Sequence, residues 1–496
     1  MRAPLPHNAD QGHRSSDTYF PAGLVVSRTV FCRLGSSFFG LRATIITIFL
    51  LLILRYRCPE TMRSKNVHAL GRLLGLDRLP EVKTLRRKIH QLAALDPAGE
   101  FMKKMAKARA EEAPQKPSVV LIDGHVQAYW GTRKVAQTWA PRCGRVVKGV
   151  TENWVHLPGG QPLLAVDSPF NEGLSKMLPQ IIKEACRALG QRSITAVFDR
   201  GGFKALLFEE MIQAGHKFLT YRKGGDAIDE SCFERRLTMI GDREYEYAPY
   251  QRQIELTVHI ATAPKTPGGR AGNRNTGRVI TLREIRILRP DKGQTAILTN
   301  IGPEGTAECL AAILFDRIGS QENSFKYMRS DFGLDECWTY GQEAVAATAD
   351  HPNPNYQALA KTLRGLQTER NKTLKQLGAA VKKDGKKALG PQSAKMDATL
   401  DAIEEKIATV QAQMQQTPAR EKPASAGFVQ PESAARSLIN TMRMVAWEVE
   451  TRLVGMLAED YSRIDDEGRK LIAAALSTRG TLRLEPGQLV IQLAPQ

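Results

Sequence analysis

Val119-Val120-Leu121-Ile122-Asp123 and, further along the chain, Ile194-Thr195-Ala196-Val197-Phe198-Asp199 are two short apolar runs that each end in an aspartate. Runs of this length that are rich in β-branched residues are typical of strands buried on both faces of a sheet. In open sheets, ligand-binding side chains gather at the carboxyl ends of such strands. We therefore expect Asp123 and Asp199 at neighbouring strand ends, although a single aspartate there more commonly forms a turn or caps a helix.

The segments around these runs predict the rest of a sheet. A third apolar run covers residues 163–166, helical patterns cover 172–189 and 203–214, and a further strand is expected over 217–221. Parallel neighbours become possible because a helix can cross over between two strands. The sequence thus predicts an α/β core in which a mixed sheet is flanked by helices.

A third carboxylate, Glu322, lies in a predicted helix over residues 306–329. Apolar residues recur there with helical spacing, at Leu310, Ile313, Leu314 and Ile318. Glu322 continues this row in steps of four, so we expect it on the apolar face, where a carboxylate needs a compensating cation such as a metal ion. The alternative is an ion pair with Lys326, worth roughly 0.3–0.5 kcal/mol.

Four motifs occur in an order that resembles one enzyme family. They are Asp123-Gly124-His125, Phe198-Asp199-Arg200-Gly201-Gly202, Ala296-Ile297-Leu298-Thr299-Asn300 and a helix with Phe315-Asp316-Arg317, Gln321-Glu322-Asn323 and Phe325-Lys326. Together, over roughly residues 40–345, they resemble the DDE transposases of bacterial insertion sequences, which have a ribonuclease-H-like catalytic core. The resemblance implies that Asp123, Asp199 and Glu322 are catalytic and hold two Mg²⁺ ions, with Mn²⁺ able to substitute, for DNA strand cleavage and strand transfer.

The helix departs from the family pattern in one respect. Much of the family has Tyr-x2-Arg-x3-Glu-x6-Lys around the glutamate, and the corresponding positions here are Phe315, Ile318, Glu322 and Arg329. The displaced Arg317, together with Lys326 and Arg329, is expected to contact DNA phosphates.

The resemblance also implies partners and a location. Double-stranded DNA is the expected partner, at the element ends and at the target, with a dimer once two ends are synapsed. The expected location is the bacterial cytoplasm, in association with the nucleoid. No membrane is expected as a partner. Two alternatives share the same features: a non-catalytic DNA-binding protein derived from a transposase, and a metal-dependent DNA nuclease without strand transfer.

The charge of the chain agrees with a nucleic-acid partner. Its 496 residues carry a formal net charge of +18, with a pI of about 9.6, which attracts polyanions and acidic surfaces in general. Seven cysteines show no metal-ligand spacing, so reduced cytoplasmic thiols are the simplest interpretation. The glycine-rich loop at 267–275 lacks the Gly-Lys-Ser/Thr ending of a P-loop, which argues against nucleotide hydrolysis.

Basic residues concentrate in the N-terminal region. Residues 55–90 contain ten Lys or Arg against three Asp or Glu, and two short helices are predicted over 67–75 and 80–92. This spacing suits a helix-turn-helix. The second helix would present Lys83, Arg86 and Arg87 to DNA while Val82, Leu85 and Ile89 pack inward. A solvated basic face on an ordinary helix pair explains the same residues equally well.

Shifts in composition divide the chain into predicted segments. Residues 1–37 are an expected disordered tail, and 38–112 an expected helical N-terminal DNA-binding domain with a buried apolar helix over 43–54, too short to span a bilayer. Residues 113–231 and 301–346 form the catalytic core, interrupted by a β-rich insertion at 232–300. Residues 347–416 are an expected coiled-coil hairpin. Residues 417–496 form a C-terminal helical segment that ends in a β-hairpin turning at 486–487.

Overall fold

The computed structural model describes residues 2–4, 40–113, 115–233, 236–240, 243–247, 249–262, 272–289, 292–345, 351–384, 391–421, 427–458, 461–478, 480–485 and 488–493. The chain divides into two compact units. The larger contains Met1–Glu255, Thr281–Glu343 and Val429–Gln496, and the smaller contains Leu256–Ile280 and Ala344–Phe428.

The larger unit is built on a mixed sheet. Its strands lie in the order β10-β11-β12-β7-β6-β2-β4-β3, and β5 also pairs with β4. The bounds are β2 Val119–Ala128, β3 Gln137–Ala140, β4 Arg145–His156, β5 Pro162–Ser168, β6 Thr195–Phe198, β7 Lys217–Tyr221, β10 Pro249–Thr262, β11 Gly272–Leu288 and β12 Gln294–Thr299. β2, β6 and β7 are parallel to one another, whereas β4 is antiparallel to β2, β5 to β4 and β12 to β7. β10 and β11 continue into the smaller unit.

Helices cover both faces of this sheet. On the first, which we call the α8 face, strand residues form one buried cluster with α8 (Ala307–Asp316): Leu121, Val197, Leu219, Leu310 and Leu314. Side chains alternate between faces along a strand, so Phe198 and Phe218 point to the other face. There both stack with Phe208 of α7 (Ala205–Gln213), and residues of α6 (Leu174–Leu189) line a pocket together with those of α7.

The predicted insertion at 232–300 is rich in strands but does not stand apart from the core. β8 (Arg236–Ile240) and β9 (Arg243–Tyr247) form a hairpin, and β10, β11 and β12 follow. Because β12 pairs with β7, placing Ile297 opposite Tyr221, these strands extend the core sheet. Of the predicted loop at 267–275, only 272–275 lie among the described residues.

The chain before the sheet is helical. Its helices are α2 (Leu41–Ile53), α3 (Val67–Leu73), α4 (Val82–Leu95) and α5 (Glu100–Glu112), with a 3-10 turn at Pro59–Ser64. α12 (Ser433–Gly455) packs against α2, α4, α5 and β5 and so joins this region to the sheet, while α13 (Ile464–Ser477) packs on α12. α2 is largely buried, as predicted. Within the described part of the chain, no helix is both long and apolar enough to cross a membrane.

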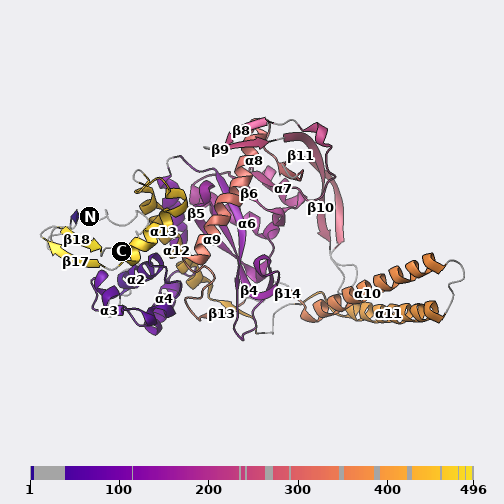
Figure 1. Ribbon diagram of the computed structural model, residues 1–496, viewed down its shortest axis with the longest axis horizontal. Coiled ribbons are helices and arrows are strands. Elements are labelled where there is room, and N and C mark those ends of the chain that lie inside the picture. The colour runs from indigo at the N-terminus through magenta and orange to yellow at the C-terminus, as the bar shows by residue number, and fades with distance from the viewer. Residues whose placement is uncertain are drawn as a thin grey trace. The chain divides into compact units, whose positions relative to one another are not determined.

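The two ends of the chain pair in a small sheet (Figure 1). β1 (Arg2–Pro4) pairs with β18 (Gln488–Leu493), which pairs with β17 (Gly480–Glu485). The predicted C-terminal hairpin is therefore found, although its turn at 486–487 lies outside the described residues. Of residues 1–37, for which disorder is expected, only Arg2–Pro4 lie among the residues described here, and they pair with β18.

A helical hairpin dominates the smaller unit. α10 (Pro354–Asp384) and α11 (Pro391–Gln416) pack along each other, in orange in Figure 1. β14 (His351–Pro352) pairs antiparallel with β15 (Arg420–Glu421) at the base of the hairpin. This matches the hairpin predicted for 347–416. The remaining short strands, β13 (Gln342–Ala344) and β16 (Val429–Pro431), pair with each other.

Candidate active site

Asp123 and Asp199 lie side by side on the α8 face. The parallel pairing of β2 with β6 ends at Ile122 opposite Phe198. The residue that follows each of these two positions is one of the aspartates, Asp123 or Asp199. Asp199 follows the last residue of β6, as predicted. The expectation that a strand ends at Asp123 is wrong, because β2 continues to Ala128. Its continuation is paired with β4, and it is the parallel neighbour β6 that ends here.

A guanidinium group neutralises Asp123. Nη1 of Arg317 lies 3.1 Å from Oδ2 of Asp123, and the amide of Gly124 donates to Oδ1 at 2.9 Å. Burial raises the pKa of Asp123, the carboxylate of Asp199 raises it further, and Arg317 opposes both effects. Asp199 accepts a hydrogen bond from the amide of Gly201 at 2.8 Å and so caps a 3-10 turn, which is the structural role that the sequence left open.

Arg317 comes from an irregular turn of helix. After α8, residues Arg317–Gln321 form a π-helical turn, and α9 (Glu322–Ser330) continues the helix. In a π turn, backbone bonds run from residue i to i+5, a feature often found at functional sites. The turn packs on the loop after β4: the amide of Gly159 donates to Asp316 at 2.9 Å, and a Cβ on Gly160 would lie 2.5 Å from the carbonyl oxygen of Ser320.

Gln321 fixes this turn to the strand that carries Asp123. Its Nε2 donates to the carbonyl oxygen of Leu121 at 3.1 Å and lies 2.9 Å from Nδ1 of His156 on β4. Gln321 and His156 are both fully buried. Burial lowers the pKa of His156 to about 3, so its ring is neutral. Sequence reasoning missed both as site residues, because Gln321 enters the family motif only as the neighbour of Glu322 and His156 belongs to no motif.

Glu322 does not take the position expected for it. Its side chain is exposed, and Ile318, one step earlier in the predicted row, is 42% exposed. The π turn at Arg317–Gln321 interrupts the α-helical repeat, so steps of four residues from Leu310 and Leu314 do not keep Glu322 on the buried row. Arg317 and Gln321 are buried instead.

The three predicted metal ligands are therefore only partly brought together. Glu322 acts on the pKa values of Tyr221 and Arg329 and so lies near both. Among the residues that the structure describes, it forms no ion pair with Lys326 or any other residue. Nor does this part of the chain contain three His, Cys, Asp or Glu side chains placed to hold one metal ion. Metal binding by the triad stays a prediction.

Tyr221 is a site residue that sequence reasoning missed. It ends β7, one position beyond the pairing of Thr220 with Phe198, and the Arg200 guanidinium lies 5.9 Å from its ring centre. Its buried hydroxyl has no hydrogen-bond partner within the described chain. Burial raises its pKa, which Arg317 lowers and Glu322 raises. The signal that could have identified Tyr221 is the strand order: β7 is a third parallel strand, and it ends beside the positions of the two aspartates.

The other predicted phosphate-binding residues of this helix differ in their surroundings. Lys326 is exposed, and Arg329 is half-buried. Burial lowers the pKa of Arg329, and Arg142 lowers it further while Asp335 raises it. Lys326 and Arg329 thus both remain possible contacts for an anion, whereas Arg317 is occupied by Asp123.

The predicted helix-turn-helix is only partly found. Val82, Leu85 and Ile89 of α4 are buried, and Lys83 and Arg87 are exposed, as expected. Arg86 is not presented to solvent, because it forms an ion pair with Glu60, donates to the carbonyl oxygen of Trp338 at 3.3 Å and stacks 3.8 Å from the ring centre of Tyr340. α3 ends at Leu73 and α4 begins at Val82, so the connection is longer than the three or four residues of that motif.

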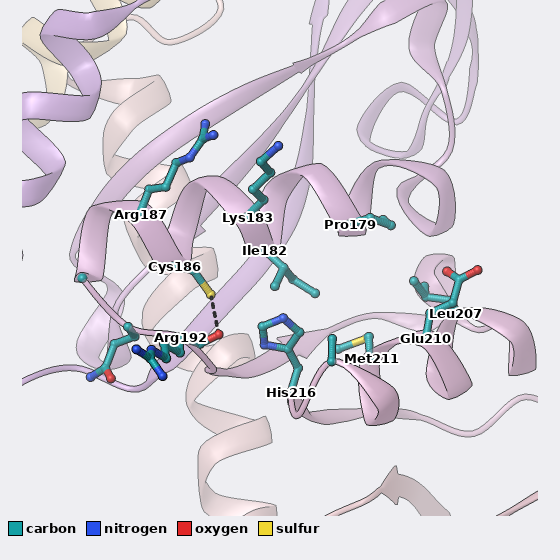
Figure 2. A pocket seen from close by; sticks show the side chains of 13 residues that line it. Pro179, Ile182, Lys183, Cys186, Arg187, Arg192, Leu207, Glu210, Met211 and His216 are labelled. Atoms are coloured by element: carbon teal, nitrogen blue, oxygen red, sulfur yellow. Dashed lines mark hydrogen bonds between the residues drawn. The ribbon is translucent and has the colours of Figure 1, made fainter.

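A prominent pocket of the described residues does not contain this site (Figure 2). It has a volume of about 660 Å³ and lies between α6 and α7, where Ile182, Cys186, Met211 and His216 point toward one another. His216 immediately precedes β7. The pocket therefore lies at the amino-terminal ends of the parallel strands, whereas Asp199 lies at the carboxyl end of β6.

Comparison with known proteins identifies the family of the chain. The model of a family described as "Transposase protein" matches residues 18–246 and 269–488. The chain therefore belongs to this transposase family. Among solved structures, it is similar to a piggyBac transposase in a synaptic complex with hairpin DNA, at 10% identity and a TM-score of 0.33, over 86% of this chain and 77% of that one. None of the curated proteins compared with the chain matches it.

Proposed function

We propose that this chain is a DDE transposase of the bacterial insertion-sequence type, with a ribonuclease-H-like core that cuts DNA strands and joins them to a target. Family membership supports a transposase. The single observation that carries the chemistry is the juxtaposition of Asp123 and Asp199 at the end of the parallel pairing of β2 with β6. Neighbouring half-buried carboxylates repel each other and are costly unless a cation compensates them.

The carboxylates suit Mg²⁺ in their chemistry, and Asp123 and Asp199 follow paired positions of β2 and β6. Mg²⁺ takes oxygen ligands and is commonly held by one or two carboxylates. Asp123 and Asp199 would hold the ions, with Glu322 as the third ligand. Two such ions, if held there, would supply activation of the attacking hydroxyl and stabilisation of the leaving oxygen. Mn²⁺ is expected to substitute.

The chain's own residues have separate tasks in this proposal. Arg317 holds Asp123 in place and compensates its charge. The unpartnered hydroxyl of Tyr221 is available to donate to a phosphate oxygen beside Asp199. Lys326 and Arg329 would attract the DNA backbone through their charge. Double-stranded DNA is the proposed substrate, and two element ends would be synapsed by a dimer.

One specific observation favours a second function, a non-catalytic DNA-binding protein derived from a transposase. Arg317 already supplies the cation that Asp123 requires, and Glu322 lies outside the buried cluster. If this arrangement persists on DNA, the fold and the basic surface would remain while the chemistry is absent.

The deciding experiment compares Asp123→Asn, Asp199→Asn and Glu322→Gln in Mg²⁺-dependent cleavage of DNA that carries the element ends. We expect each to abolish cleavage and to leave gel-shift affinity unchanged. Mn²⁺ binding followed by electron paramagnetic resonance provides a readout independent of activity, and each substitution should weaken it. Asp226→Asn and Glu111→Gln, at exposed positions, serve as matched controls.

The outcomes separate the proposals. Full cleavage by any one substituted protein removes that residue from the site. A wild-type chain that binds end DNA and neither cleaves it nor binds Mn²⁺ is the non-catalytic protein. Cleavage without joining to a target identifies a nuclease without strand transfer.

A further inference from the structure

The hairpin that follows Asp123 is basic and carries no acid. Between Gly124 and Thr151 the sequence contains five basic residues and no Asp or Glu: Arg133, Lys134, Arg142, Arg145 and Lys148. The segment runs from the end of β2 through β3 into β4. All but Lys148 of these cations are exposed. We call residues 129–148 the tryptophan hairpin, for the two side chains described next.

Two tryptophans are exposed on this hairpin. Trp130 is 71% exposed and Trp139 is 57% exposed, and Val146, opposite Trp139 in the β3–β4 register, is 51% exposed. The Arg145 guanidinium lies 5.5 Å from the ring centre of Trp130. Large aromatic surfaces left in water among polar residues mark sites of interaction.

A pocket of about 520 Å³ adjoins Trp130. Its aromatic lining consists of Tyr129, Trp130 and Tyr340, and Tyr340 is itself 69% exposed. The Gln342 amide, which also lines the pocket, donates to the Tyr129 hydroxyl at 3.0 Å. The lining also includes Glu60, Asp335 and Glu336; Glu60 pairs with Arg86 and Asp335 pairs with Arg142. The aromatic faces, with amide and hydroxyl groups beside them, match a nucleobase, whose faces stack on aromatic rings and whose edge forms hydrogen bonds.

We infer that the tryptophan hairpin binds unpaired bases of a DNA strand, with Trp130 and Trp139 as stacking surfaces and the surrounding cations holding phosphates. The inference rests on the proposed function for its choice of DNA as the ligand. Proteins that bind single strands combine a positively charged surface with aromatic side chains on which bases stack. In an intact duplex the base faces are covered by their neighbours, so the rings require unpaired bases.

Charge argues against a second copy of the chain as the occupant. In a symmetric dimer the same patch faces itself, and a hairpin with five Lys or Arg, of which Arg142 is paired with Asp335, would meet a copy of itself. Like charges opposed across an interface are costly. A polyanion meets the same surface with complementary charge.

The location of the hairpin gives it access to a strand held near the candidate active site. Asp123 and Ala128 lie on one continuous strand, β2. Five residues at about 3.3 Å each separate them by about 17 Å. At 3.4 Å per nucleotide this is about five nucleotides of a stacked strand. Unpaired bases a few nucleotides from the cut can therefore reach Trp130.

The test measures binding by the full chain, without divalent metal, to single-stranded oligodeoxythymidylate and to a duplex of the same length that lacks element ends. The double substitution Trp130→Ala with Trp139→Ala should weaken single-strand binding roughly 30-fold or more, as expected for two lost base stacks. Duplex affinity should change less than about threefold, because phosphate contacts dominate it. Trp130→Phe with Trp139→Phe should retain most single-strand affinity, since a phenyl ring still stacks.

Two further variants serve as controls. Arg145→Gln should weaken binding to both probes and flatten the salt dependence of single-strand binding by about 0.7 log units. Met456→Ala truncates a side chain of similar exposure outside the hairpin and should change nothing.

Unchanged single-strand affinity in the double alanine variant overturns the inference. A wild-type chain that binds the duplex but not the single strand also overturns it and leaves the proposed function intact. If light scattering shows a wild-type dimer that the double alanine variant dissociates, with single-strand affinity unchanged, the patch is a subunit interface instead. Conversely, full cleavage by Asp123→Asn and Asp199→Asn would refute the proposed site without affecting this measurement.

Discussion

Replacing Arg317 with glutamine tests the electrostatics of the candidate site directly. Arg317 is 8% exposed, lies 3.1 Å from Asp123 and compensates a carboxylate that is 28% exposed. Removing one partner of a fully buried ion pair costs about 3–5 kcal/mol, because the other charge is left without a partner. Asp123 retains some contact with water, so we expect Arg317→Gln to cost about 1–3 kcal/mol at neutral pH.

The cost should depend on pH in a defined direction. Burial raises the pKa of Asp123, and Arg317 lowers it, so Arg317→Gln raises it further. When the pKa of a carboxyl group is raised in the folded state, the folded protein loses stability as the pH rises from the ordinary pKa of the group, about 3.9, through the raised pKa. Below that window Asp123 is protonated in both states. The cost of Arg317→Gln should therefore be small near pH 3 and complete at neutral pH.

Urea unfolding followed by tryptophan fluorescence can measure this cost. The five tryptophans, at 130, 139, 154, 338 and 447, all belong to the larger unit, so the signal reports on that unit. In a double-mutant cycle, Arg317→Gln should cost much less once Asp123→Asn has removed the charge. Asp123→Asn alone should also be destabilising, because it leaves the buried Arg317 guanidinium without its partner. Arg192→Gln, at an exposed position, is the control. An equal cost in both backgrounds would refute the ion-pair argument.

Three further predictions concern the surroundings of the site. His156→Gln should make the protein less sensitive to acid, because the folded wild type keeps His156 neutral down to about pH 3. Between about pH 6.5 and pH 3, the free energy of unfolding of the wild type should therefore fall by about 1.4 kcal/mol per pH unit relative to that of the variant. Urea unfolding at a series of pH values measures this difference. Lys83→Ala and Arg87→Ala should each flatten the salt dependence of duplex binding by about 0.9 log units if they contact phosphate, whereas Arg86→Ala should lower the thermal midpoint instead. Gly160→Ala should destabilise by about 1–3 kcal/mol in the same urea assay, because φ is +80° and the added Cβ meets a backbone oxygen.

The strands of the core could be predicted from sequence because their signal is local. Runs such as 119–123 and 194–199 are apolar and β-branched, and buried strands of a mixed sheet need those residues whatever their neighbours are. The two aspartates followed from the same pattern. The end of β2 could not be predicted in this way, because β2 continues beyond Asp123 through pairing with β4, a partner that lies more than 20 residues away in sequence.

The roles of residues that contact partners far away in the sequence could not be predicted from sequence. Arg86 looks like a solvent-facing cation on an amphipathic helix, yet Glu60 and Tyr340 hold it inside the protein. Gln321 looks like an ordinary helical residue, yet it binds the backbone of β2 and the ring of His156. Local periodicity reports which face of an element is buried. It does not report which polar group of another element lies opposite, and contacts with such groups hold the side chains of a site in place.

The π turn bears on the spacing by which this helix differs from the DDE pattern that it resembles. The family pattern places an arginine four residues before the glutamate, whereas Arg317 lies five residues before Glu322. Between them, Arg317–Gln321 form the π turn, in which residue i bonds to i+5 rather than i+4 and one more residue fits into the turn. Residues five apart across such a turn are stacked much as residues four apart are in an α-helix. The additional residue in the sequence and the additional residue in the turn thus offset each other, and Arg317 reaches Asp123 despite its displaced position.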